Sequence, residues 1–385
     1  MNFLILGDGP EELAWARHLA EHAEHRLLAA FPGFKGWSAP GANPVIAPRD
    51  LDDALAMATV EAALVGGAPE FRAEALRRVA AAGLPAICLH PPGPDSEAYY
   101  QVALSRAETG AVLVPDLPAR LHPGLERVRR AIEGKEVGVF RALRHESPAE
   151  RGPGDLVRRD FPRRVDLTRA LLGEIEAVTA TGAPAGIHPD EELIVHLRGP
   201  RASRAEIRIW AGPPEPARLV AVGAEGTLTF EYDLEFLHPA RLIRRESNGA
   251  ETVTELAPWD PRAAILGTLA AAIERRATHA HPDLLDGTRA MELAEAVVRG
   301  LKRGRTVDLH YEEISEAGTF KSVMTSFGCV VFLGALFAML LAMVGPALGF
   351  GWTLYLAYAI PPVLIGFMLL QVLRFAIRSS SEKPS

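Results

Sequence analysis

The sequence has few cysteines and no excess of basic charge. Cys88 and Cys329 are the only cysteines among 385 residues. The first falls in a predicted buried strand and the second in an apolar tail, so we expect no disulfide and no cysteine-based metal site. With 41 Lys and Arg against 48 Asp and Glu, the net charge is −7, which argues against nucleic acid as a partner. The start of the chain, Met1–Gly7, lacks the basic segment of a signal peptide.

Charge is also missing from a long stretch near the end of the chain. No Asp, Glu, Lys or Arg occurs from Ser322 to Leu373. The stretch holds two apolar runs, 323–345 and 352–373, and a bilayer-spanning helix needs about 20 apolar residues. The basic residues that flank the runs all lie on one side of the expected hairpin. We therefore expect a two-span transmembrane hairpin that contacts the lipid bilayer, with the soluble domains and both termini in the cytoplasm. The alternative is a pair of buried helices in a soluble core.

The first third of the chain alternates between strand-like and helix-like segments. The strand-like apolar runs are Asn2–Leu6, Arg26–Ala30, Ala62–Val65, Ala86–Leu89 and Val112–Val114. Helical patterns at Glu70–Ala82 and Asp95–Thr109 separate the later runs. This alternation predicts an α/β fold, a parallel sheet with helices on both faces, as in a Rossmann-like nucleotide-binding domain.

A glycine turn follows the first strand-like run. It matches the start of the fingerprint G-x-G-x-x-G, whose backbone N–H groups meet a pyrophosphate. The candidate residues for binding NAD or NADP are Gly7, Asp8, Gly9, Pro10 and Glu11. Glu12 stands where the third glycine is expected, and carboxylates at this helix start would repel a phosphate. No Asp or Glu stands at the end of the second strand-like run, where an acid would bind the ribose hydroxyls of the cofactor. Two interpretations stay open: retained cofactor binding, or a scaffold whose loop only turns the chain.

From about Arg120 to Asp308 the pattern changes to half-buried strands, in which apolar and polar residues alternate. The expected strands are Val137–Glu146, Ile175–Thr181, Glu192–Leu197, Ala205–Trp210, Arg218–Val222 and Thr227–Tyr232. Helices at Pro123–Glu133, Ala263–Arg276 and Gly287–Arg303 accompany them. An α+β domain with an open, mostly antiparallel sheet is predicted.

Four segments follow one another in this part of the chain: Glu126–Arg141, Val165–Gly173, Gly223–Leu228, and Asp286–Glu292 followed by Gly304–Val307. In this order they resemble pieces of the glucose-fructose oxidoreductase / inositol dehydrogenase / MocA family. The second reads like the family's D-L-x-R-x-L-L-G helix end and the third like its G-x-x-G-T-L hairpin. The resemblance covers nearly all of residues 1–310. It implies NAD(P) binding, chemistry on sugars or polyols in a cleft between two domains, and pairing of copies through the open sheet. The expected divisions are 1–118 (Rossmann-like), 119–318 (α+β), 319–378 (hairpin) and 379–385 (cytoplasmic tail).

The residues that carry catalysis in that family are replaced in this chain. His90-Pro91-Pro92 stands at the place of the family's E-K-P motif, so a proline replaces the lysine. Arg159 and Arg163 stand at the place of its D-x-x-x-H pair. An arginine stays charged and cannot act as a general base near neutral pH. We therefore assign no catalytic residue.

The replacements suggest another use of the cleft. Four arginines fall within seven positions, Arg158–Arg164, and guanidinium groups suit carboxylates and phosphates. The candidate substrate residues are His90, Arg120, Arg159 and Arg163, with an anionic or sugar-like small molecule as ligand. The alternative is a solvated basic loop. The histidine spacing indicates no metal site. Two functions remain: an NAD(P)-dependent oxidoreductase with rearranged groups, or a non-catalytic ligand-binding or scaffolding module.

Overall fold

The computed structural model divides the chain into two units. Met1–Leu309 forms the first and His310–Ser385 the second. The described residues are 1–22, 24–34, 44–150, 155–181, 191–274, 281–309, 337–344, 350 and 355. Both predicted sheets and the candidate site lie in the first unit.

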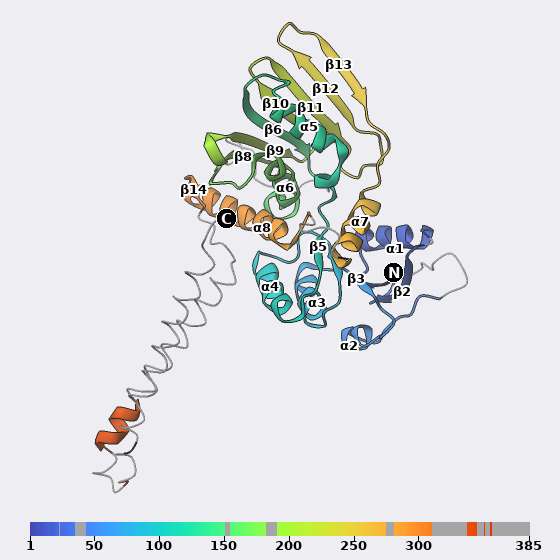
Figure 1. The fold of residues 1–385 in the computed structure, drawn as a ribbon, viewed down its shortest axis with the longest axis vertical. Helices are drawn as coiled ribbons and strands as arrows, with labels where there is room; N and C mark the ends of the chain where they lie inside the picture. Colours follow the sequence, from blue (N-terminus) through green and yellow to red (C-terminus); the bar gives the residue numbers. More distant parts are fainter. Residues whose placement is uncertain are drawn as a thin grey trace, which may run out of the picture. The chain divides into compact units, whose positions relative to one another are not determined.

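A parallel five-stranded sheet forms the first half of this unit (Figure 1). Its strands are β1 (Asn2–Leu6), β2 (Arg26–Phe31), β3 (Ala62–Val65), β4 (Ala86–Cys88) and β5 (Leu113–Pro115), in the order β2-β1-β3-β4-β5. The strands are short apolar runs buried on both faces, which is typical of parallel sheets covered by helices. The predicted Rossmann-like architecture is confirmed. The order reverses at β1, and ligands of such sheets bind beyond the carboxyl ends of the strands at this switch point.

Helices cover both faces of the first sheet. α2 (Leu51–Leu55), α3 (Pro69–Ala81) and α4 (Glu97–Thr109) pack on one face. The other face is covered by α1 (Pro10–Glu21) and by α7 (Pro261–Ile273). The buried side chains of Ile265 and Leu269 on α7 share a core with Phe3, Ile5 and Trp15. The first sheet is therefore completed by a helix from late in the chain.

A nine-stranded sheet forms the second half. Its strands are β6 (Phe140–Pro148), β7 (Ala177–Thr181), β8 (Glu192–Arg198), β9 (Arg204–Trp210), β10 (Ala217–Gly223), β11 (Gly226–Tyr232), β12 (Arg241–Glu246), β13 (Glu251–Glu255) and β14 (Val307–Asp308). The order is β13-β12-β11-β10-β6-β9-β8-β7-β14, and among these pairs only β6 and β9 run parallel. The predicted, mostly antiparallel sheet is thus found as a mixed sheet.

One face of the second sheet is covered by helices. α5 (Pro123–Glu133), α6 (Phe161–Leu172) and α8 (Leu284–Arg303) share a core with its inward side chains. Short helical turns, η1 (Pro118–Leu121), η2 (Leu156–Asp160, a π-helical turn) and η3 (Pro200–Ala202), connect the larger elements. Because η2 leads directly into α6, the arginine-rich segment of the sequence lies at the start of this helix, beside the first domain.

The predicted localisation, a two-span membrane protein with cytoplasmic ends, is corrected by the structure. Among the residues that it describes, no helix combines the length and the apolar character that crossing a bilayer requires. Most of the two predicted spans, 323–345 and 352–373, lies outside the described residues. Of the first span, helix is described over 337–344.

Candidate functional site

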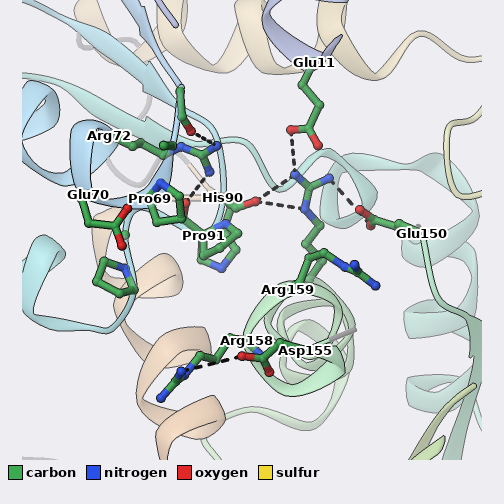
Figure 2. A pocket seen from close by; sticks show the side chains of 15 residues that line it. Glu11, Pro69, Glu70, Arg72, His90, Pro91, Glu150, Asp155, Arg158 and Arg159 are labelled. Atoms are coloured by element: carbon green, nitrogen blue, oxygen red, sulfur yellow. Dashed lines mark hydrogen bonds and ion pairs between the residues drawn. The ribbon is translucent and has the colours of Figure 1, made fainter. Parts of the chain in front are cut away.

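A cavity of about 530 Å³ lies beyond the carboxyl ends of β3 and β4, where the first domain faces η2 and α6 (Figure 2). Its size is within the usual range for small-molecule sites, about 300–1,000 Å³. It is lined by Glu11, Gly67, Ala68, Pro69, Glu70, Arg72, His90, Pro91, Gly93, Pro94, Glu150, Asp155, Arg158, Arg159 and Arg163. The lining thus combines four arginines, four carboxylates and a wall rich in proline.

The cavity wall of the first domain is held by Arg72. This residue lies one turn into α3 and donates hydrogen bonds to the carbonyl oxygens of Gly67, at 2.8 Å, and Pro91, at 2.6 Å. Gly67, which follows β3, has φ +86°. This left-handed conformation favours glycine and turns the chain away from the strand. Since Arg72 uses its guanidinium on carbonyl groups, it fixes the loops after β3 and β4 relative to each other (Figure 2).

Glu12 fills the crevice between the ends of β1 and β3. Its side chain is buried, and its Oε1 accepts a hydrogen bond of 2.5 Å from the backbone N–H of Gly67. A Cβ atom added at Gly9 would lie 2.5 Å from Glu12 Oε2, and one at Gly66 would lie 2.1 Å from Oε1. The space left by these two glycines is therefore taken by the carboxylate of the chain itself.

The residues of this crevice do not fit a dinucleotide bound in the usual way. The second glycine of the fingerprint, Gly9 here, normally lets the backbone approach the pyrophosphate. Glu12 lies against that glycine and brings a negative charge to the same place. A phosphate would have to displace a charge-assisted hydrogen bond worth about 1.5–3 kcal/mol. In addition, no Asp or Glu occurs from Arg26 to Arg49, where an acid for the ribose is expected.

Arg163 joins the two domains at the floor of the cavity. Its guanidinium donates to the carbonyl oxygen of His90 at 2.8 Å, from the first domain. It also lies 3.4 Å from Glu11 Oε2 and 3.8 Å from Glu150 Oε1. These contacts offset the cost of its burial, and the pKa of Arg163 is raised above its usual value. Arg163 therefore connects the two domains through charged contacts.

Arg158 and Arg159 reach the cavity from η2. The Nε of Arg159 donates to the buried carboxylate of Asp160 at 2.8 Å. Arg158 is more exposed and lies 3.7 Å from Asp155, a pair at the edge of the cavity (Figure 2). The side chain of Arg158 is 59% exposed, so it can reorient toward a ligand at little cost.

His90 lies at the base of the same cavity, directly after β4. It is 1% exposed, and its Nδ1 is 3.0 Å from the hydroxyl of Tyr99. Its Nε2 has no hydrogen-bond partner among the described residues. Burial, and after it the charges of Arg163 and Arg72, hold the pKa of His90 well below its usual value, so the imidazole is neutral near pH 7.

Arg120 does not line this cavity. It lies in η1, where its guanidinium bonds Asp166 at 2.5 Å and Asp286 at 3.0 Å in a largely buried ion network. Arg169 completes the network from the next turn of α6. The sequence indicated a charged residue near the cleft, but the carboxylates that engage it come from elements far apart in the chain.

The structure therefore brings together part of the predicted site. Of the glycine-turn residues, Glu11 lines the cavity, while Asp8 and Pro10 are exposed outside it and Gly7 and Gly9 lie at the crevice. His90, Arg159 and Arg163 line it as well. Sequence reasoning missed Arg72 and Glu150, which carry no motif, and it missed the inward position of Glu12.

No family model and no curated protein matches the sequence. Solved structures do match. A myo-inositol dehydrogenase from Corynebacterium glutamicum is 21% identical, with TM-score 0.64, over 81% of this chain and 99% of that one. The chain has the fold of these oxidoreductases. An aldose-aldose oxidoreductase from Caulobacter crescentus is 17% identical (TM-score 0.67, 80% and 99% covered). An oxidoreductase from Agrobacterium radiobacter in complex with NAD+, L-tartaric acid and magnesium is 14% identical (TM-score 0.63, 80% and 98%). The fold that the family resemblance implied, with a parallel Rossmann-like sheet and a mixed second sheet, is confirmed.

Proposed function

We propose that the chain binds a small, polyhydroxylated, sugar-like molecule in the cavity between its domains and does not use NAD(P) for hydride transfer. The observation that carries this proposal is the buried Glu12 carboxylate, which occupies the crevice at Gly9 and Gly67 while the cavity next to it stays open. A binding protein would thus use the substrate side of an oxidoreductase fold without its cofactor side.

The charges in the lining favour a polyhydroxylated ligand over a strongly anionic one. Four arginines face four carboxylates, so the wall has no excess of positive charge. Arg163 is already paired with Glu11 and Glu150. Hydroxyl groups both donate and accept hydrogen bonds, and a sugar can use guanidinium and carboxylate groups together. A single carboxylate on the ligand, as in a sugar acid, would find Arg158 and Arg159 on one side.

The lining also argues against the usual chemistry. Pro91 has no ionisable group, and Arg159 and Arg163 cannot remove a proton from a hydroxyl near neutral pH. The one imidazole among the described lining residues, His90, is buried and bonded to Tyr99. Binding without turnover is the function that these residues support best.

Calorimetric titration of the full-length protein tests the proposal. We expect no heat of binding for NADH or NADPH at about millimolar concentration, and measurable binding of at least one of myo-inositol, glucose or glucuronate. Arg158→Ala should weaken the binding of glucuronate more than that of the neutral sugars. Arg127→Ala is the matched control, because Arg127 pairs with Glu136 on the distant α5 side of the second domain. Tight NADH binding by the unaltered protein would overturn the proposal.

Two substitutions distinguish the effect of the charge of Glu12 from the effect of its volume. Glu12→Gly recreates the third glycine of the fingerprint and empties the crevice, and we expect it to strengthen NADH binding at least tenfold. Glu12→Gln removes the charge but keeps the volume and an acceptor for Gly67. It should bind NADH no better than the unaltered protein if the volume is what excludes the cofactor.

A second candidate is an NAD(P)-dependent oxidoreductase with His90 as its proton acceptor. It is favoured by the position of His90, which follows β4 at the carboxyl edge of the parallel sheet and lines the cavity. Absorbance at the wavelength of NADH, with NAD+ and each sugar present, distinguishes the two. Formation of NADH that is lost in His90→Gln would establish this second function.

A further inference from the structure

Two histidines lie one helical turn apart at the end of α1. His18 lies in the last turn of α1, and His22 is the residue that directly follows the helix, with an extended backbone. The third member of the cluster is Asp260, which precedes α7 in a distant part of the chain. One ligand atom from each of the three residues lies within 4.8 Å of the other two. The cluster lies where α7 returns to cover the first sheet.

His18 and Asp260 already face each other. The Nδ1 of His18 is 3.6 Å from Asp260 Oδ2. The other oxygen, Oδ1, accepts hydrogen bonds from the backbone N–H groups of Arg262 and Ala263, at 2.9 and 3.1 Å, as the N-cap of α7. These bonds fix the orientation of the carboxylate and leave Oδ2 directed at the imidazole.

His22 has the hydrogen-bond pattern of a metal ligand. Its Nδ1 lies 2.8 Å from the carbonyl oxygen of His18, which makes Nδ1 the donor and leaves the lone pair on Nε2. Metal-bound histidines almost always donate their other N–H to a carbonyl or carboxylate in this way. The rings of His18 and His22 are 4.1 Å apart. His22 is exposed, so the cluster is open to solvent.

Arg262, two residues after Asp260, brings a positive charge to this part of the chain. Its guanidinium lies over the ring of Trp15, 5.9 Å from the ring centre.

We propose that His18, His22 and Asp260 form a binding site for a divalent metal of the zinc class, which joins α1 to the start of α7. Zinc takes imidazole nitrogens and carboxylate oxygens at about 2.0–2.2 Å, so two ligands of one tetrahedral ion lie about 3.3 Å apart. The 3.6 Å between His18 and Asp260 is close to this value. Two nitrogens and one oxygen leave the fourth position for water. This site is separate from the cavity and independent of its ligand.

Zinc titration of the full-length, chelator-treated protein tests this site. We expect one zinc ion per chain, measured by calorimetry and by metal analysis after desalting, and a rise of the thermal midpoint with zinc. His22→Ala and Asp260→Asn should each weaken zinc binding at least tenfold. Neither is expected to prevent folding, since His22 is exposed and the amide oxygen introduced by Asp260→Asn can still cap α7.

The control is a second cluster, formed by His281, Asp283 and Asp286. Its Asp286 is already engaged by Arg120, so His281→Ala should leave zinc binding unchanged. With Co²⁺ in place of zinc, we expect the visible absorption of a tetrahedral site, which His22→Ala should abolish. No binding at about 0.1 mM zinc, or equal binding by all variants, would overturn the proposal. Loss of binding in His281→Ala alone would also overturn it, because the ion would then lie elsewhere.

Discussion

Glu12 fills the space beside the glycine turn of this chain. In the fingerprint the third glycine allows close packing, and its replacement puts a carboxylate between two other glycines. The hydrogen bond to Gly67 turns this carboxylate inward, where its charge is matched by a backbone N–H group. In the function that we propose, this single side chain closes a turn that would otherwise bind a phosphate.

Gly66→Ala should destabilise the protein through Glu12. The added Cβ would lie 2.1 Å from the carboxylate oxygen, and overpacking of this kind costs about 1–3 kcal/mol. Glu12→Ala alone leaves the N–H of Gly67 without its partner, also at about 1–3 kcal/mol. In the double variant the clash is gone, so the free energy of unfolding should fall by less than the sum. Additive losses, measured by urea unfolding, would show that the two residues do not interact.

Arg120 and Arg158 should respond in opposite ways to substitution. Arg120 is engaged by Asp166 and Asp286 in a buried network, and removing one partner of such a network costs about 3–5 kcal/mol. Arg120→Met should therefore lower the free energy of unfolding strongly. Arg158→Ala should change it by less than about 0.5 kcal/mol, because its pair with Asp155 is exposed. Denaturant unfolding of both variants measures these losses. Equal losses in the free energy of unfolding would contradict the prediction.

At the scale of elements, the second domain depends on polar contacts inside its core. His145 on β6 is fully buried and lies 2.9 Å from the hydroxyl of Tyr232 on β11. Its Nδ1 lies 3.2 Å from the hydroxyl of Thr168 on α6. These contacts tie the sheet to the helix that carries the arginine-rich segment, and so they help to position the cavity.

The stability of the protein should therefore depend on the protonation of His145. Burial, and after it the charge of Arg164, lower the pKa of His145 to about 3. Between this value and the usual histidine pKa of about 6.5, the unfolded chain binds a proton that the folded chain does not, so the free energy of unfolding falls as the pH falls. His145→Gln lacks this effect. The gap in stability between the unaltered protein and this variant should narrow by about 1.5–2 kcal/mol between about pH 6.5 and pH 5. A constant gap in urea unfolding would contradict the prediction.

The elements differ in how far they could be predicted. The strands of the first sheet are continuous apolar runs, and their positions were readable from the sequence alone. β12 and β13 were not predicted, because they are rich in charged residues and β13 is exposed along its whole length. They are held as strands by pairing with β11 and by ion pairs such as Arg245 with Glu251.

The site was less predictable for a related reason. The sequence shows which residues carry charge but not which partner each one meets. Glu12 and Gly67 are 55 residues apart, and no local pattern links them. The histidine spacing alone indicated no metal site, because Asp260 lies near His18 and His22 only through the return of α7.

At the scale of the whole molecule, the chain passes from the first sheet to the second and returns to the first. α7 follows β13 and packs on the face of the first sheet that holds Phe3, Ile5 and Trp15. The outer face of the second sheet carries ion pairs, for example between Arg208 and Glu192. Pairing of two copies through this face stays a prediction, which the mass of the protein in solution would test.

Leu269→Ala should destabilise the first sheet, although Leu269 is far from the strands of that sheet in the sequence. Leu269 is fully buried against that sheet, and such truncations cost about 2–5 kcal/mol. We expect faster hydrogen exchange at the amides of Leu4 and Ile5 as well as a lower free energy of unfolding. Leu237→Ala is the control, since Leu237 is 71% exposed. Unchanged exchange in β1 would mean that α7 does not stabilise this sheet.

The late position of α7 has a consequence for the newly made chain. β1 is made long before α7, because the helix that covers one of its faces begins only at Pro261. At about 5–20 residues per second, Phe3, Ile5 and Trp15 stay uncovered by α7 for roughly 13–50 s. We therefore expect the nascent chain to bind holding chaperones through this apolar face, and to release them only after α7 has been synthesised.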